Sequence, residues 1–153
     1  MFIKHKMKKI VLISVFFLFT LACLAKSLIL KSPNDMTVKK LDLIKKEVSR
    51  MGYHNRWMVI SGHRSEWYNS RLPNANKGSY HLKGMAIDIY VFDINGNWKF
   101  DQEDISILMK ANDEVERKNP KLVGAFGTYL SRGYFTQRMI HFDTRGFKRK
   151  YNV

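Results

Sequence analysis

Two short segments hold the residue types that bind metals and catalyse hydrolysis: residues 79–88 (SYHLKGMAID) and residues 140–146 (IHFDTRG). In the first segment, Asp88 is the single charge in an apolar stretch that is typical of a buried strand. A carboxylate in that position must be paired, hydrogen-bonded or bound to a metal. Gly84 permits a close bend of the backbone, so that His81 can fold back beside Asp88.

The second segment places two polar side chains on one side of a strand. His141 and Asp143 alternate with apolar residues and therefore share a strand face, about 6–7 Å apart. Together, His81, Asp88 and His141 would form a zinc site with three protein ligands and an open fourth position, which is the arrangement of a hydrolytic zinc. The residues by themselves also allow histidines that are only hydrogen-bonded, and an Asp88 that accepts from backbone amides or an arginine.

The hydrophobic pattern predicts the elements that position these side chains. From Val38 to Met51, apolar residues recur at spacings of three and four, which predicts an amphipathic helix that Gly52 ends. Residues 61–79 have no such period and are expected to form a long ordered loop, which in a small domain is usually functional. Strands are expected at residues 56–61, 85–92 and 139–143.

The middle of the chain predicts a turn followed by a second helix. Asn95-Gly96 favours a hairpin turn into a short strand at residues 98–100. Asp101 and Asp104 are spaced to cap a helix that stops before Pro120. Because helices and strands mix without βαβ regularity, we expect one α+β domain, with a small antiparallel β-sheet flanked by helices.

A calcium loop is an alternative interpretation of residues 93–104. Oxygen-bearing side chains occupy its first, third, fifth and twelfth places, as in a calcium-binding loop. Trp98, however, stands where the sharp turn of such a loop needs glycine. A turn followed by a helix cap is therefore the favoured interpretation.

Residues 1–25 are expected to be a targeting segment outside the fold. Four lysines without an acid precede an apolar run from Ile10 to Ala25, which is the layout of a secretory signal peptide. Cleavage after Ala25, lipid attachment at Cys23 and retention as a membrane anchor stay open, although a spanning helix needs about 20 apolar residues. We expect an exported protein of the periplasm or cell envelope, with its functional domain at residues 26–153.

The chain is strongly basic, with 27 lysines and arginines against 13 acids. Without residues 1–25 it keeps 23 basic residues against the same 13 acids, a formal balance of +10, and loses its only cysteine. This composition excludes an internal disulfide framework and a multi-cysteine zinc finger. A basic surface attracts polyanions, and after export an anionic cell-wall polymer or a membrane surface is a better partner than nucleic acid.

Three motifs occur in a specific order: SGHRS at residues 61–65, Ser-x-His-x-x-Gly-x-Ala-x-Asp at residues 79–88, and IHFD at residues 140–143. In this order they resemble the zinc D-alanyl-D-alanine carboxypeptidase and murein endopeptidase family, whose fold is shared with the hedgehog signalling domain. The resemblance covers about residues 57–146, which is most of the expected domain. It implies the same hedgehog-like zinc peptidase fold for this chain.

The resemblance also implies roles for individual residues. His81, Asp88 and His141 match the positions that hold zinc in the family. Arg64 matches the arginine that contacts the substrate carbonyl or the tetrahedral intermediate. The family's first motif usually has a tyrosine where this chain has His63.

The general base is less clearly implied. Several family members carry an acid three residues before the last histidine, and here that position is Arg138. Asp143 is the better candidate, because it shares a strand face with His141 and the endopeptidase branch of the family also has His-x-Asp there. Glu66 is the other carboxylate near the motifs. Alternatively, Asp143 is an acceptor that orients the ligand histidine.

We therefore expect a zinc-dependent metallopeptidase that hydrolyses amide bonds in the stem or cross-link peptides of peptidoglycan, either as an endopeptidase or as a D,D-carboxypeptidase. Zinc is the expected cofactor, a peptidoglycan peptide the expected substrate, and an anionic wall polymer the expected surface partner. We expect no nucleic acid, and membrane contact only through the N-terminal segment. One alternative is an inactive, zinc-containing wall-binding module, which Arg138 favours. Another is a basic nucleic-acid-binding protein that stacks bases on Trp57, Trp67 and Tyr68.

Overall fold

The computed structural model describes residues 30–152 apart from residues 74, 131–132 and 134. The expected targeting segment, residues 1–25, lies outside the described residues. Across the described part, helices and strands alternate irregularly along the chain, which confirms the α+β class. None of the helices described is both long enough and apolar enough to span a bilayer.

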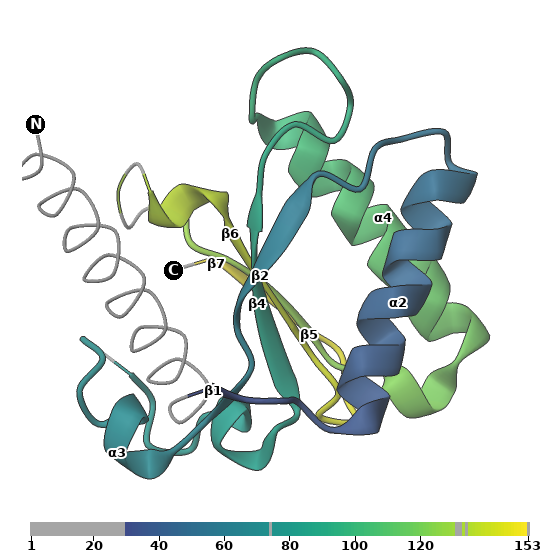
Figure 1. Ribbon diagram of the computed structural model, residues 1–153. Coiled ribbons are helices and arrows are strands. Elements are labelled where there is room, and N and C mark those ends of the chain that lie inside the picture. The colour runs from purple at the N-terminus through teal and green to yellow at the C-terminus, as the bar shows by residue number, and fades with distance from the viewer. Residues whose placement is uncertain (1–29, 74, 131–132, 134, 153) are drawn as a thin grey trace, which may run out of the picture.

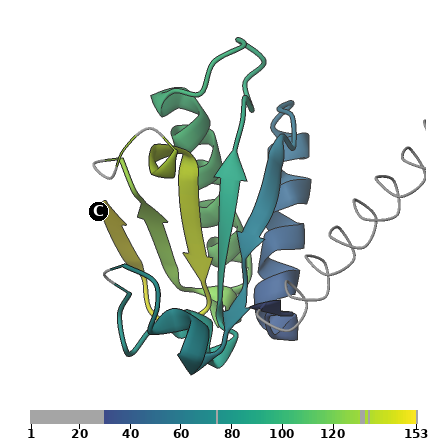
Figure 2. The ribbon, with the colours of Figure 1, turned by 60° about the vertical axis from the view of Figure 1, so that its left-hand side comes forward.

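Five strands form the main sheet, in the spatial order β2-β4-β6-β5-β7. Figure 1 views this sheet nearly edge-on. Their bounds are β2 Trp57–Ser61, β4 Ala86–Val91, β5 Ala125–Thr128, β6 Met139–Asp143 and β7 Arg149–Asn152. Figure 2, turned by 60°, shows the strands side by side with helix α4 behind them. The expected strands at residues 56–61, 85–92 and 139–143 are confirmed as β2, β4 and β6.

The sheet is mixed, so the expectation of a purely antiparallel sheet is wrong in one pair. All neighbours are antiparallel except β5 and β7, which run parallel. The cause is the occupancy of β6, whose two edges are already taken by β4 and β5. The chain reverses after β6, pairs instead on the outer edge of β5, and therefore runs parallel to it.

Two long helices cover one face of this sheet (Figure 1). Helix α2 (Asp35–Arg50) begins where the Asn34 side chain accepts the backbone N–H of Thr37, and Gly52 follows its end with a φ of 86°. Helix α4 (Gln102–Lys118) begins with a capping box between Asp101 and Asp104. Both expected helices are confirmed.

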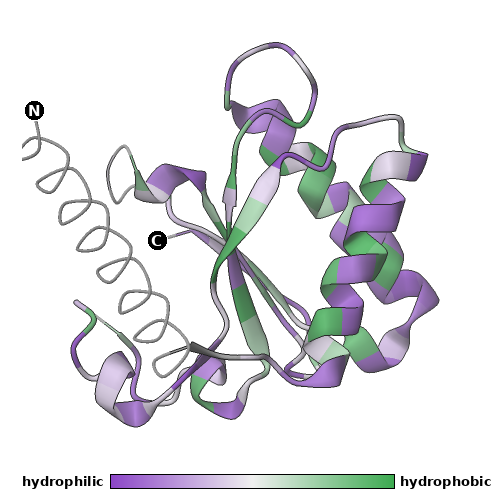
Figure 3. Ribbon diagram, in the orientation of Figure 1, coloured by the Kyte–Doolittle hydropathy of each residue, from purple (hydrophilic) through white to green (hydrophobic). Residues whose placement is uncertain are grey.

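The hydrophobic core lies between these helices and the sheet. In β4, Ile87, Ile89 and Val91 are buried toward the core, together with residues such as Ile140 and Phe142 of β6. Apolar colouring accordingly gathers on the central strands and on the helix sides that face them (Figure 3). Because strand side chains alternate, the residues between these apolar ones point to the opposite face of the sheet.

The segment that was expected to be a loop packs over one end of that opposite face (Figure 2). It contains β3 (His63–Arg64), which pairs with β1 (Leu30–Lys31), and the one-turn helix α3 (Glu66–Asn69). A 3-10 turn, η1 (Tyr80–Lys83), follows and leads into β4. Nε2 of the His63 ring lies 3.1 Å from the carbonyl oxygen of Leu82, so this histidine holds η1 against β3.

The expected strand at residues 98–100 is wrong. The Asn97 side chain accepts the backbone N–H of Lys99 at 2.9 Å, and the Asp93 carboxylate accepts those of Gly96, Asn97 and Trp98 at 2.7, 3.0 and 3.1 Å, so two of the donors at residues 98–100 are already used. Arg56 donates to the same carboxylate at 2.9 Å. These contacts favour a turn followed by a helix cap at residues 93–104, rather than a calcium loop.

A buried ion pair joins the two helices to the end of β6. The Lys40 ammonium of α2 lies 2.7 Å from the Glu116 carboxylate of α4 and 2.8 Å from the carbonyl oxygen of Asp143, and both charged side chains are 1% exposed. Burial lowers the pKa of Lys40 against the opposing effect of Glu116. The expected apolar stripe on α2 is thus interrupted, because Lys40 faces inward while Val38 is exposed.

Lys40→Met would leave the buried Glu116 with only the exposed Lys148, 3.8 Å away, as a cationic partner. We therefore expect it to lower the free energy of unfolding by about 3 kcal/mol. The double variant Lys40→Met/Glu116→Gln removes both charges and keeps an oxygen for the N–H of Gly124, so it should be more stable than Lys40→Met. Urea unfolding of the full-length protein measures both differences. The exposed Lys39→Met is the control, and a Lys40→Met variant as stable as this control would contradict the prediction.

Candidate metal centre

Three side chains of metal-binding type converge on the sheet face away from the helices. They are His81 of η1, Asp88 of β4 and His141 of β6, and one potential ligand atom from each lies within 4.8 Å of the others. Asp88 and His141 are directly paired in the antiparallel register of β4 and β6. The three residues are 2%, 0% and 5% exposed, respectively, so all three are buried. The structure thus brings together the three residues expected from sequence.

The turn η1 places His81 above the sheet. Ser79 caps the turn by accepting the backbone N–H of His81, and Gly84 ends it with a left-handed φ of 67°. A Cβ on Gly84 would also lie 3.4 Å from the Asn34 backbone nitrogen and 3.6 Å from the His63 ring. Glycine is favoured here by the left-handed backbone conformation, since a Cβ would make only ordinary contacts.

The hydrogen bonds of His81 leave one nitrogen for a ligand. Its Nδ1 lies 2.6 Å from the carbonyl oxygen of Gly62, which can only accept, so Nδ1 carries the proton. Its Nε2 is buried, 3.1 Å from a carboxylate oxygen of Asp88, and has no hydrogen-bond partner. A buried nitrogen lone pair aimed at a carboxylate fits a metal ion between them.

His141 is oriented by a carboxylate on each side. Its Nδ1 lies 2.9 Å from Asp88 and its Nε2 lies 3.0 Å from Asp143. Burial opposes protonation of this ring, but the hydrogen bonds to Asp143 and Asp88 outweigh it and raise the pKa of His141. A positive charge is therefore favoured here, and a metal ion bound at Nδ1 would supply it while Nε2–H donates to Asp143.

The Asp88 carboxylate is the negative centre of the group. Burial alone would raise its pKa, but the adjacent ring of His81 and the hydrogen bond from His141 hold the pKa of Asp88 far below its usual range. Arg64 also donates to Asp88, and its Nε donates to the hydroxyl of Ser61 at 2.8 Å. The structure therefore places Arg64 directly beside the metal ligands.

Asp143 accepts hydrogen bonds from three residues. It accepts from Nε2 of His141, from the backbone N–H of Ala125 at 2.7 Å, and from Arg145, whose Nε lies 2.8 Å away. Burial would raise the pKa of Asp143, but these hydrogen bonds hold it well below its usual range. Asp143 is thus a buried, permanently charged acceptor for the ring of His141.

Glu66, the other candidate for the general base, does not contact the group. It lies exposed in the first turn of α3 and, within the described part of the chain, makes no ion pair or hydrogen bond to His81, Asp88 or His141. Arg138, three residues before His141, has its guanidinium carbon 5.3 Å from the ring centre of Phe100.

Sequence reasoning missed two residues beside the group. Arg145 clamps Asp143 and stacks on Tyr80, with its guanidinium carbon 4.3 Å from that ring. Tyr151 comes from β7, and its ring centre lies 5.9 Å from that of His141. The position of Arg145 two residues after Asp143 was an available signal, whereas β7 (RKYN) has no apolar run that would predict a strand.

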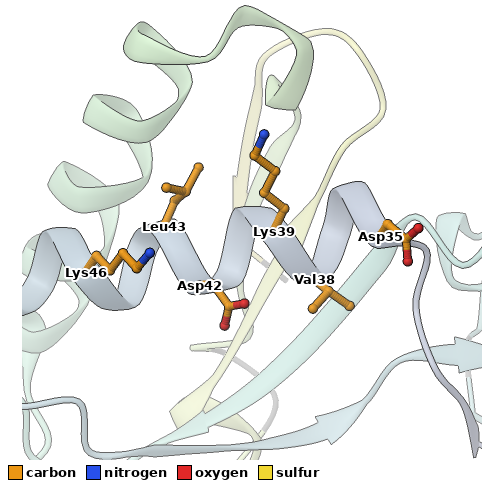
Figure 4. Close-up of a pocket in the computed structure, with 6 residues that line it drawn as sticks. All are labelled: Asp35, Val38, Lys39, Asp42, Leu43 and Lys46. Carbon is orange, nitrogen blue, oxygen red and sulfur yellow. The ribbon is translucent and has the colours of Figure 1, made fainter.

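A shallow surface hollow lies elsewhere, on the outer side of α2 (Figure 4). It is lined by Asp35, Val38, Lys39, Asp42, Leu43 and Lys46. Since α2 covers the sheet face opposite the three ligand residues, this hollow is separate from the candidate metal centre.

No protein-family model matches the chain, and no curated protein matches it. The assignment of the site therefore rests on the residues and their geometry.

We expect the purified full-length protein to bind one zinc ion per chain, and the variants His81→Ala and Asp88→Ala to lose this binding, because two remaining ligands do not hold zinc tightly. Metal analysis after dialysis measures the zinc content. Zinc affinity should fall as the pH is lowered, because the ion competes with the proton on His141.

His54→Ala is the matched control, since His54 is exposed and lies outside the group. Wild-type zinc content in the His81→Ala protein would contradict the assignment.

Proposed function

We propose that this protein is an exported zinc metallopeptidase that hydrolyses amide bonds in peptidoglycan peptides. The proposal is carried by the convergence of His81, Asp88 and His141, with the Nε2 of His81 buried and unpartnered. Two imidazole nitrogens and one carboxylate oxygen are a donor set typical of hydrolytic zinc sites. The three sequence motifs that resemble zinc D-alanyl-D-alanine peptidases supply the substrate class, and the N-terminal signal supplies export.

Bound there, zinc supplies a Lewis acid that makes water nucleophilic near neutral pH and polarises an amide carbonyl. The protein's own residues orient the histidine ligands and stabilise the negative charge that develops on the substrate. Gly62 and Asp143 hold the two imidazole rings in the required tautomers. Arg64, already beside Asp88, has N–H donors that can stabilise the carbonyl oxygen as it becomes negative.

The contacts of Asp143 favour its positioning role over the role of general base. A base must take a proton, and a carboxylate whose pKa is held low by Arg145, His141 and Ala125 is a poor acceptor of one. An acceptor on the far nitrogen of a ligand histidine needs the opposite property, a stable negative charge. Asp143 has that property.

Exposed cations near the site suit an anionic substrate surface. Arg71, Lys77 and Lys83 are exposed on the same segment that carries Arg64 and His81. We propose that they attract anionic wall polymers and raise the local concentration of substrate at the metal centre.

The inactive wall-binding module is the second candidate function. Asp88 and Asp143, the two carboxylates of the group, are both fully engaged, and Arg138 stands in the usual place of the acid. A protein with this arrangement could keep zinc and bind the wall without cleaving it. Measurement of turnover separates the two candidates directly.

Purified peptidoglycan incubated with the full-length protein should release peptide fragments that mass spectrometry identifies, and a chelator should abolish their release. Arg64→Ala should keep its zinc and lower kcat by about 100-fold, the usual cost of one oxyanion donor. Binding to peptidoglycan with no new fragments, at any zinc concentration, would overturn the peptidase and favour the binding module.

Asp143→Asn separates the two roles of Asp143. We expect a zinc affinity lower by about 10- to 100-fold, as is typical when the partner of a ligand histidine is changed. If Asp143 is instead the base, zinc affinity will stay at the wild-type value while kcat falls by about 100- to 10,000-fold. Competition with a fluorescent zinc chelator measures the affinity, and peptidoglycan digestion at saturating zinc measures kcat.

A further inference from the structure

Strand β7 brings a tyrosine into line with the candidate metal centre. In the sheet register, Asp88 of β4 is paired with His141 of β6, His141 with Gly127 of β5, and Gly127 with Tyr151 of β7. Side chains that are directly opposite across neighbouring strands point to the same face of a sheet. Tyr151 therefore belongs to the same face and the same level of the sheet as two of the three ligand residues.

The absence of a side chain at Gly127 lets the tyrosine lean toward the metal centre. A Cβ on Gly127 would lie 2.3 Å from Cζ of Tyr151 and 2.6 Å from its hydroxyl oxygen. The tip of the ring thus occupies the space above β5 where a side chain would otherwise stand, between β7 and His141. The ring centres of Tyr151 and His141 are 5.9 Å apart, so the phenol reaches the edge of the ligand group.

The hydroxyl of Tyr151 supplies the chemistry of this position. A phenol carries one O–H, which can donate a hydrogen bond. The ring fills the space over Gly127, and the O–H at its tip is the polar group that β7 brings to this level of the sheet.

We propose that Tyr151 is a catalytic residue that donates a hydrogen bond to the carbonyl oxygen of the scissile amide as that oxygen gains negative charge. This inference rests on the proposed peptidase function. Water adds to the carbonyl carbon, the C–N bond breaks, and the amine leaves with a proton, while Tyr151 keeps its own proton throughout. Arg64 approaches from the β3 side and Tyr151 from the β7 side, so the two donors flank the ligand group.

Tyr151→Phe removes only the hydroxyl, so the ring continues to fill the space over Gly127. We expect kcat on peptidoglycan to fall by about 100-fold with KM nearly unchanged, because the hydrogen bond forms only as charge develops. Zinc content and urea stability should equal those of the wild type. Calorimetry with a dipeptide phosphinate, whose tetrahedral group carries the negative oxygen of the transition state, should show binding weakened by a similar factor.

Tyr53→Phe is the matched control. Because Tyr53 packs against the helix-side core, this substitution should change neither kcat nor the affinity for the phosphinate. Gly127→Ala pushes the phenol aside and should reproduce the loss of kcat. If the wild type cleaves peptidoglycan and Tyr151→Phe retains its kcat and phosphinate affinity, the role of Tyr151 is overturned while the peptidase stands. A wild type that neither cleaves peptidoglycan nor binds the phosphinate overturns both.

Discussion

A carboxylate with no exposure to water, at the centre of a sheet, is the constraint on which the site depends. A buried carboxylate without partners is strongly destabilising, so the fold surrounds Asp88 with cationic and hydrogen-bonding groups. His81 reaches it from a 3-10 turn, His141 from the neighbouring strand, and Arg64 from β3. Each of these partners fixes one element: the turn that Gly84 closes, the register of β4 with β6, and the short β3 strand. The negative charge of Asp88, which brings these partners together, also favours a bound cation.

Support for this arrangement comes from the opposite side of the sheet. Lys40 and Glu116 form a buried ion pair among the helices, and Lys40 also donates to the main-chain oxygen of Asp143. Gly124 approaches the same oxygen so closely that a Cβ there would lie 1.9 Å from it. The main chain of Asp143 is thus held from the helix side, while its side chain holds the ring of His141. Asp143 links the packing of the helices to the orientation of a candidate metal ligand, His141.

The sequence predicts helices and strands correctly where the deciding contacts are made by residues close together in the chain. The caps at Asn34 and Asp101 act on backbone groups within the next turn, and both helices begin where these caps place them. The failures occurred where a distant partner decided the outcome. At residues 98–100, the side chains of Asp93 and Asn97 had already taken the N–H groups of Trp98 and Lys99, which a strand needs. Strand β7 is short and polar, and it exists because the edge of β5 was free to pair.

The three ligand residues could be named from their types and spacing, because a charged residue in an apolar strand requires partners of a limited chemical range. Their convergence within 4.8 Å, and the identity of the free nitrogen on His81, depended on the register of β4 with β6 and on the carbonyl of Gly62. The engagement of Asp143 by Arg145 and the approach of Tyr151 over Gly127 were decided by tertiary structure alone. Local sequence determines which groups are available to bind a metal, whereas only the packed sheet determines which atom of each group faces it, since that depends on neighbours far apart in the chain.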